Sequence, residues 1–316
     1  MDSMEKILEK IKRLTLQHDQ ISPDIIRERE VKLGLRNPDG TGVVVGITTK
    51  GRVIGYELVP DERDASRKIV KPIDGKLYYC GYDVNDIIEH NEKNGSFGFE
   101  EIVYLLLTSV LPDKNDLEKF SDELHKRSRL SNMERNIIIE EVENFNQMYA
   151  LHSVISHLSR CDKDPDTNDF SSITEQCINV IAKAPVIVAN NYNVYRYMKG
   201  EDLRISRPKE NLSMSENFLY MLTGEMPDRE EALIFDACLI MHAEHGGGNN
   251  STFTVRTVSS SGANTYMAIA AGVASLSGQF HGGANESVMA MMKQCQKEVK
   301  DCTKEKEVKK ISRESP

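Results

Sequence analysis

The sequence predicts a mainly α-helical fold, and three observations support this. Most segments along the chain have apolar residues at the spacing of an α-helix. The connections between these segments are short, and only one stretch near the N-terminus has clear β character. No repeat of fixed period occurs, which argues against a solenoid or a propeller.

Composition narrows the class of protein. The chain has 316 residues, of which 39% are apolar and 28% charged, as in a globular protein. The net charge of −9 argues against a general nucleic-acid binder. No run approaches the roughly 18 apolar residues of a membrane helix, and the N-terminus lacks a signal-peptide core. Six scattered cysteines without CxxC spacing indicate a reducing cytosol, so we expect a cytoplasmic protein without a membrane partner.

The first elements are two helices. Met4 to Leu16 is predicted to be helical because its apolar residues share one face: Ile7, Leu8, Ile11 and Leu14. Ser22-Pro23 resembles an N-cap followed by proline at the first helical position, which opens a helix over Asp24 to Leu33.

A β-hairpin is predicted next, over Gly42 to Leu58, with a turn near Lys50-Gly51 between two short strands. The following stretch, Gly75 to Ile87, is polar and aromatic, and we expect it near the surface.

Helices then follow one another. The candidates in the middle of the chain are Asn115 to Arg127, Asn132 to Phe145, Tyr149 to Ser159 and Ile173 to Lys183. Ala184 to Gly200 extends the last of these past Pro185, a residue that ends or kinks a helix. Ser213 to Glu216 is a capping box for a helix over Asn217 to Leu222, and Pro227 separates that helix from the next.

The helix after Pro227 carries the first histidine motif. Arg229 to Ile240 has apolar spacing that suits one buried face. The helix is predicted to stop at Gly246–Gly248, which places His242 and His245 one turn apart in its last turn. The C-terminal end of a helix favours a cationic imidazole, and a cationic His245 suits a carboxylate ligand.

The second motif has the opposite setting. His281 precedes Gly282-Gly283-Ala284-Asn285, after which Glu286 to Met292 is predicted to begin a new helix that extends to about Lys300. The N-terminal end of a helix favours the neutral ring, which can donate a hydrogen bond to a carbonyl that is becoming an enol.

These two motifs, HAEHGGGN and HGGAN, resemble the HxxHxGGN and GPxHGxAN segments of the citrate synthase family, although no proline precedes His281 here. The family includes citrate and 2-methylcitrate synthases, and the motifs fit both. The resemblance implies that His281 is catalytic and holds the thioester carbonyl of acetyl-CoA. It implies that His245 and Asn249 bind oxaloacetate, with His242 in support. The residues expected to contact acetyl-CoA are Gly282, Gly283 and Ala284.

The resemblance also implies an architecture. We expect a mainly α, citrate-synthase-like large helical domain with a short N-terminal β-hairpin, in which the helix containing FEEIVYLLL is Phe99 to Leu111. Family members dimerise through stacked antiparallel helices, and the small residues of Gly262 to Gly278 suit such packing. A homodimer is therefore expected, with acetyl-CoA as a co-substrate, no permanently bound cofactor and no metal.

The family's small-domain motif, GxGHxVY…DPR, is not found in this chain, and no histidine follows His281. We therefore expect residues 1–282 to form the large domain and residues 283–316 to form the start of a largely missing small domain plus a charged tail. On this hypothesis the base and the second catalytic histidine are absent, and condensation by this chain alone is impaired.

Other functions fit less well. A non-catalytic dicarboxylate-binding protein derived from citrate synthase is the main alternative. A metal-dependent hydrolase would use His242, Glu244 and His245, but HAEH lacks the HExxH spacing of zinc proteases. No GxSxG motif marks a nucleophilic hydrolase, and Gly246–Gly248 follows a predicted helix rather than the strand of a dinucleotide site.

Overall fold

The computed structural model describes residues 3–18, 22–30, 32, 34–35, 37, 42–61, 64–141 and 146–299. The chain divides into two compact units, Met1–Val45 and Gly46–Pro316. In the described part, no helix combines the length and the apolar character that crossing a bilayer requires. The predicted charged tail, from residue 300 onward, lies outside the described residues.

The first unit contains two helices, α1 (Ser3–His18) and α2 (Pro23–Glu28). The predicted N-cap is confirmed, because the backbone N–H of Asp24 donates to Oγ of Ser22 at 3.2 Å. The predicted extent of this helix, to Leu33, is wrong: α2 ends at Glu28, and Glu30 has a positive φ of 51° that stops helical geometry.

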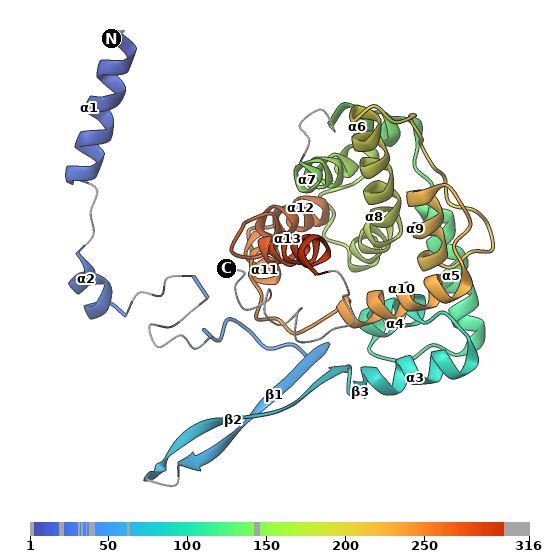
Figure 1. The fold of residues 1–316 in the computed structure, drawn as a ribbon, viewed down its shortest axis with the longest axis horizontal. Coiled ribbons are helices and arrows are strands. Elements are labelled where there is room, and N and C mark those ends of the chain that lie inside the picture. Colours follow the sequence, from blue (N-terminus) through green and yellow to red (C-terminus); the bar gives the residue numbers. More distant parts are fainter. Residues whose placement is uncertain are drawn as a thin grey trace. The chain divides into compact units, whose positions relative to one another are not determined.

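The second unit begins with a three-stranded antiparallel sheet of β1 (Gly51–Asp61), β2 (Asp64–Tyr79) and β3 (Tyr82–Asp83). Figure 1 shows β1 and β2 as a long ribbon that leads through β3 into a helix. The predicted turn at Lys50-Gly51 is wrong. Gly51 pairs with Tyr79, and the N–H of Cys80 donates to the carbonyl of Lys50, so this dipeptide starts the ladder instead of reversing it.

The surface placement predicted for Gly75 to Ile87 is wrong at Tyr79, whose exposed fraction is 0%. The Tyr79 ring joins a small core with side chains of the helices that follow: Val84, Ile87, Ile102, Leu105 and Ile240. The aromatic residues of this stretch therefore anchor the sheet to the helices.

The rest of the described chain is helical. After β3 come α3 (Val84–Asn94), α4 (Phe99–Thr108), α5 (Lys114–Ser128), α6 (Asn132–Glu141), α7 (Gln147–His157), a 3₁₀ turn η2 (Leu158–Cys161), α8 (Phe170–Met198), α9 (Met214–Thr223), α10 (Arg229–His242), α11 (Asn250–Ser260), α12 (Thr265–Leu276) and α13 (Gly283–Glu298). The predicted mainly α fold is confirmed. The last residues predicted for the α6 segment, 142–145, lie outside the described residues.

The long helix α8 is central to the packing, and α5, α6, α7, α9 and α12 contact it (Figure 1). Val186 and Ile187 of α8 lie in the main hydrophobic core with Val154 of α7 and Met221 of α9. The helix continues past Pro185, so packing on several sides outweighs the hydrogen bond that proline removes.

The predicted capping box is confirmed, and a small residue allows close packing of two helices within the chain. Ser213 and Glu216 form the reciprocal capping box of α9. In α12, a Cβ on Gly272 would come 2.6 Å from Cγ2 of Val255 in α11, so the small residue lets these two helices approach closely.

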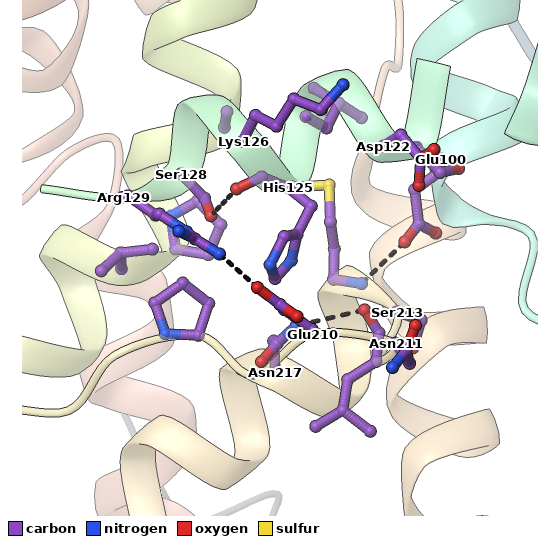
Figure 2. Close-up of a pocket in the computed structure, with 18 of the residues that line it drawn as sticks. Glu100, Asp122, His125, Lys126, Ser128, Arg129, Glu210, Asn211, Ser213 and Asn217 are labelled. Carbon is purple, nitrogen blue, oxygen red and sulfur yellow. Dashed lines mark hydrogen bonds and ion pairs between the residues drawn. The ribbon is translucent and has the colours of Figure 1, made fainter. Parts of the chain in front are cut away.

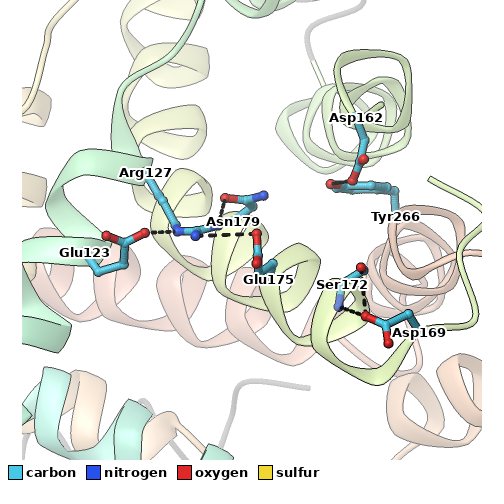
Figure 3. A network of polar contacts seen from close by, with 8 residues as sticks. All are labelled: Glu123, Arg127, Asp162, Asp169, Ser172, Glu175, Asn179 and Tyr266. Carbon is cyan, nitrogen blue, oxygen red and sulfur yellow. Dashed lines mark hydrogen bonds and ion pairs between the residues drawn. The ribbon is translucent and has the colours of Figure 1, made fainter. Parts of the chain in front are cut away.

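Polar side chains link α5, α8 and α12 (Figure 3). Arg127 of α5 donates to Glu123 at 2.6 Å and to Asn179 of α8 at 2.9 Å. Tyr266 of α12 donates to Asp162 at 2.7 Å. Burial acts to raise the pKa of Asp162, but the hydrogen bonds from Tyr266 and from backbone N–H groups outweigh it, so that pKa lies below its usual value.

Candidate active site

Helix α10 carries the first histidine motif and is anchored by a buried acid. Asp236, 2% exposed, accepts a hydrogen bond from the N–H of Gly98 at 2.7 Å and another from the hydroxyl of Ser215. Burial raises the pKa of this carboxyl. These contacts join α10 to α9 and to the start of α4, so the end of α10 has a defined position.

The end of α10 differs from the prediction. The helix stops at His242, and His245 lies three residues beyond it, exposed, instead of in the last turn. The hydroxyl of Tyr79 provides the physical reason: it donates to the carbonyl of Ile240 at 2.7 Å and accepts from the N–H of Glu244 at 3.2 Å. A buried side chain from β2 thus satisfies the backbone where the helix would otherwise continue. The dipole argument for a cationic His245 loses its basis.

His242 is the last residue of α10. Its Nδ1 lies 2.7 Å from the carbonyl oxygen of Cys238, one turn earlier in the same helix. The ring is exposed, and this contact leaves its other nitrogen directed away from the helix backbone.

The glycine loop after His242 is held by Glu244. The carboxylate of Glu244 accepts a hydrogen bond from the N–H of Gly246, whose φ of +96° favours glycine. Gly51 lies against the same carboxylate: a Cβ at position 51 would overlap the Glu244 side chain. The start of β1 therefore packs against the Glu244 side chain, and the Glu244 carboxylate holds the loop backbone through its hydrogen bond to Gly246.

Asn249 is the N-cap of α11. Its Oδ1 accepts from the N–H of Thr252 at 2.8 Å, and its Nδ2 donates to Oγ1 of Thr252 at 2.7 Å. Its second amide hydrogen faces the carbonyl of Gly246 at 3.5 Å, the limit of a hydrogen bond. The bond from the N–H of Thr252 caps the helix, so the Nδ2 contacts, and most readily the weak one to Gly246, can be exchanged for a ligand atom without uncapping it.

His281 stands just before a helix, as predicted. It lies in the turn between α12 and α13, with its N–H donating to the carbonyl of Gly278 at 2.9 Å. Gly282 follows, and its N–H donates to the carbonyl of Leu276 at 3.0 Å. A Cβ on Gly282 would collide with that carbonyl oxygen, so the turn requires glycine at this position.

The two histidine motifs meet at the start of α11. Nε2 of His281 lies 2.8 Å from Oγ of Ser251, the second residue of α11 and two residues beyond Asn249. Nothing in the sequence patterns singled out Ser251, because the contact joins residues 30 positions apart. If the serine hydroxyl donates, Nε2 accepts and the ring proton sits on Nδ1, where it can donate to a ligand carbonyl.

The remaining predicted site residues are the start of α13. Gly283 is its first residue, and the Gly283 N–H faces the carbonyl of Gly278 at 3.4 Å. Ala284 belongs to the first turn of α13, and its side chain lies outside the described residues. Beside His281, the Phe280 side chain is 98% exposed.

A cavity lies beside the first histidine motif. A cavity of about 320 Å³ adjoins the glycine loop and is lined by residues on both sides of the β1 start: Thr48, Thr49, Lys50, Gly51, Arg52, Ile54, Tyr78, Cys80 and Gly81. Thr48 would lie 3.8 Å from a Cβ on Gly247, which places this cavity beside the loop. Among the described residues, no group of three or more His, Cys, Asp or Glu has the arrangement of a metal site.

Comparison with known proteins identifies similar families and structures. The family described as "Citrate synthase, C-terminal domain" matches residues 62–314. Citrate synthase 2 of Bacillus subtilis is 39% identical over 70% of this chain, and citrate synthase of Haloferax volcanii is 36% identical over 69%. The chain spans 56% of the length of each of these relatives. The crystal structure of citrate synthase from Pyrobaculum aerophilum superposes with a TM-score of 0.63 at 26% identity, covering 83% of this chain and 62% of that one.

Proposed function

The chain belongs to the citrate synthase family, and from that premise we propose that it takes part in the condensation of acetyl-CoA with oxaloacetate to citrate and CoA. The observation that carries the proposal is the contact between His281 and Ser251. It joins the second histidine motif to the helix that the first motif opens, which supports the proposal that the thioester and the keto-diacid bind side by side.

His281 is the proposed catalytic residue. With Ser251 donating to Nε2, the proton on Nδ1 donates to the thioester carbonyl and stabilises the charge that develops there when the α-carbon loses its proton. The hydrogen bond of a neutral imidazole holds the oxygen without transferring a proton to it. A general base outside these motif residues must take the α-proton. The carbon nucleophile then attacks the keto carbon of oxaloacetate, the new alkoxide oxygen takes up a proton, and water hydrolyses the thioester to release CoA.

The remaining groups are proposed to bind the substrates. His245 is exposed beside the loop and free to turn toward a carboxylate, and the weak third contact of Asn249 can be exchanged for an oxaloacetate oxygen. His242 supports this half of the site. The backbone of Gly282, Gly283 and Ala284, at the N-terminal end of α13, is proposed to approach acetyl-CoA closely, and no permanently bound cofactor is required.

We further propose a homodimer in the cytoplasm. The packed pair α11 and α12 leaves large apolar side chains exposed: Phe253, Met267 and Leu276. Pairing these helices with those of a second copy would bury them. The described cysteines are free thiols, which suits a reducing compartment. Sedimentation equilibrium tests the dimer, and a monomer at micromolar concentration would contradict it. The domain boundary between residues 282 and 283 stays a proposal.

A thiol-release assay with acetyl-CoA and oxaloacetate, run with calorimetry of oxaloacetate binding, tests the function. We expect His281→Ala to abolish CoA release while oxaloacetate still binds, and His245→Ala to weaken that binding. Binding without CoA release in the unmodified chain would replace the catalytic proposal with the non-catalytic dicarboxylate-binding alternative. Absence of both binding and release would refute the site itself.

A further inference from the structure

A second cavity lies between α5, α8 and the segment that leads into α9 (Figure 2). Its lining contains no residue of either histidine motif. Its volume is about 750 Å³, within the range of about 300–1,000 Å³ that is typical of small-molecule sites. Its inner wall is largely apolar, and buried side chains from three helices contribute to it: Leu124, Ala182, Val186 and Met221. None of the residues assigned to the condensation lines this cavity.

One polar atom in the cavity wall has no protein partner. Nε2 of His125 is buried and makes no hydrogen bond in the described structure, while the backbone carbonyl of His125 accepts from Oγ of Ser128 at 2.7 Å. The ring extends from α5 toward the opposite segment in Figure 2. An unpaired buried nitrogen is unfavourable, so a group that forms a hydrogen bond with it gains affinity.

Several other polar groups in the wall already have partners. Arg129 and Glu210 form an ion pair at 2.6 Å across the rim, and Glu100 accepts from the N–H of Met214 at 2.7 Å. Lys126 extends along α5 away from the His125 ring (Figure 2). The cavity lining therefore includes both positively and negatively charged side chains. Neither sign of charge predominates, which favours a neutral ligand.

We propose that this cavity binds a neutral, largely apolar ring compound that donates one N–H or O–H to Nε2 of His125, with the ring proton on Nδ1 and the imidazole turned toward the cavity. The apolar wall supplies most of the affinity by burying the ring, and the imidazole supplies orientation. This proposal is independent of the condensation, because it uses a different set of residues.

Indole and benzofuran form a matched pair of probes, since they have nearly the same shape and only indole carries an N–H. Calorimetry should show indole binding about 5–10-fold more tightly than benzofuran, the effect of one hydrogen bond. This preference should disappear in His125→Phe. The imidazole NMR signals of His125 should shift with indole, while those of His152, whose Nδ1 is bonded to the carbonyl of Ala270, should not.

A filling variant tests the location. Ser121 of α5 lines the cavity, and Ser121→Phe should abolish binding of both probes, whereas Lys119→Phe adds the same ring to an exposed position of the same helix and should leave binding unchanged. Equal affinity for the two probes, no indole binding up to its solubility limit, or an unmoved His125 signal at saturation would each overturn the proposal. The NMR measurement uses the unmodified chain, so it decides the matter even if Ser121→Phe fails to fold.

Discussion

The hydroxyl of Tyr79 offers the sharpest test of how the fold positions the site. Tyr79→Phe removes one oxygen atom and retains the buried ring. That oxygen makes two hydrogen bonds to backbone groups at the end of α10, to Ile240 and from Glu244. A net contribution of about 0.5–1.5 kcal/mol per hydrogen bond predicts a loss of about 1–3 kcal/mol in the free energy of unfolding.

Tyr79→Phe should change the local structure of the site as well as the overall stability. Without the hydroxyl, the carbonyl of Ile240 can continue the helical pattern, and the loop that carries His245 loses its fixed starting point. We therefore expect weaker oxaloacetate binding in addition to a lower urea midpoint. The assays are urea unfolding followed by circular dichroism and calorimetry with oxaloacetate.

Tyr82→Phe is the matched control, because Tyr82 is 42% exposed in the neighbouring strand β3. A change there should stay within about 0.5 kcal/mol. If Tyr79→Phe and Tyr82→Phe gave the same small loss, the hydroxyl would not determine where α10 ends, and the explanation for the position of His245 would fail.

Three further predictions concern the turn, the serine and a buried acid. Gly282→Ala should lower the free energy of unfolding by about 1–3 kcal/mol and reduce CoA release, since its methyl group meets a backbone carbonyl. Ser251→Ala should lower the rate of CoA release by about tenfold and change the ring ¹⁵N shifts of His281, because the hydroxyl no longer selects the tautomer. Glu100 is buried, which raises its pKa from 4.5 to about 6, so the folded state holds a proton that the unfolded state has lost in this range. Stability should therefore fall by about 2 kcal/mol in total as pH rises from well below 4.5 to well above 6, of which about 1 kcal/mol is lost between these two pH values, and Glu100→Gln should remove this part of the fall.

Each of these has its own control. A Cβ on Gly283 would come no closer than 3.4 Å to a side chain, so Gly283→Ala should leave the free energy of unfolding unchanged; an equal loss of stability in both glycine variants would rule out the steric explanation. Ser260→Ala removes an exposed hydroxyl at the other end of α11 and should leave the His281 signals unchanged. A pH profile for Glu100→Gln identical to that of the unmodified chain would show that the carboxyl does not titrate as described.

The sequence by itself determined the features that depend on neighbouring residues. The capping box at Ser213 and the N-cap at Ser22 follow from side chains bonding to backbone within a few residues. The position of His281 before a helix was predicted from the residues that follow it, and α13 begins at Gly283 without a side-chain cap. The mainly α class follows from apolar spacing in the same way. Family resemblance rested on the two short histidine motifs, which are also local.

Only the tertiary structure decided the rest. The hairpin turn was misplaced because Lys50 and Gly51 pair with residues near Tyr79, and the end of α10 was misplaced because Tyr79 satisfies its last carbonyl groups. The contact of His281 with Ser251 likewise depends on α12 folding back along α11. In each case a hydrogen-bonding group from a distant segment outweighs the local preference, because burial makes an unpaired polar group costlier than a weaker local pattern.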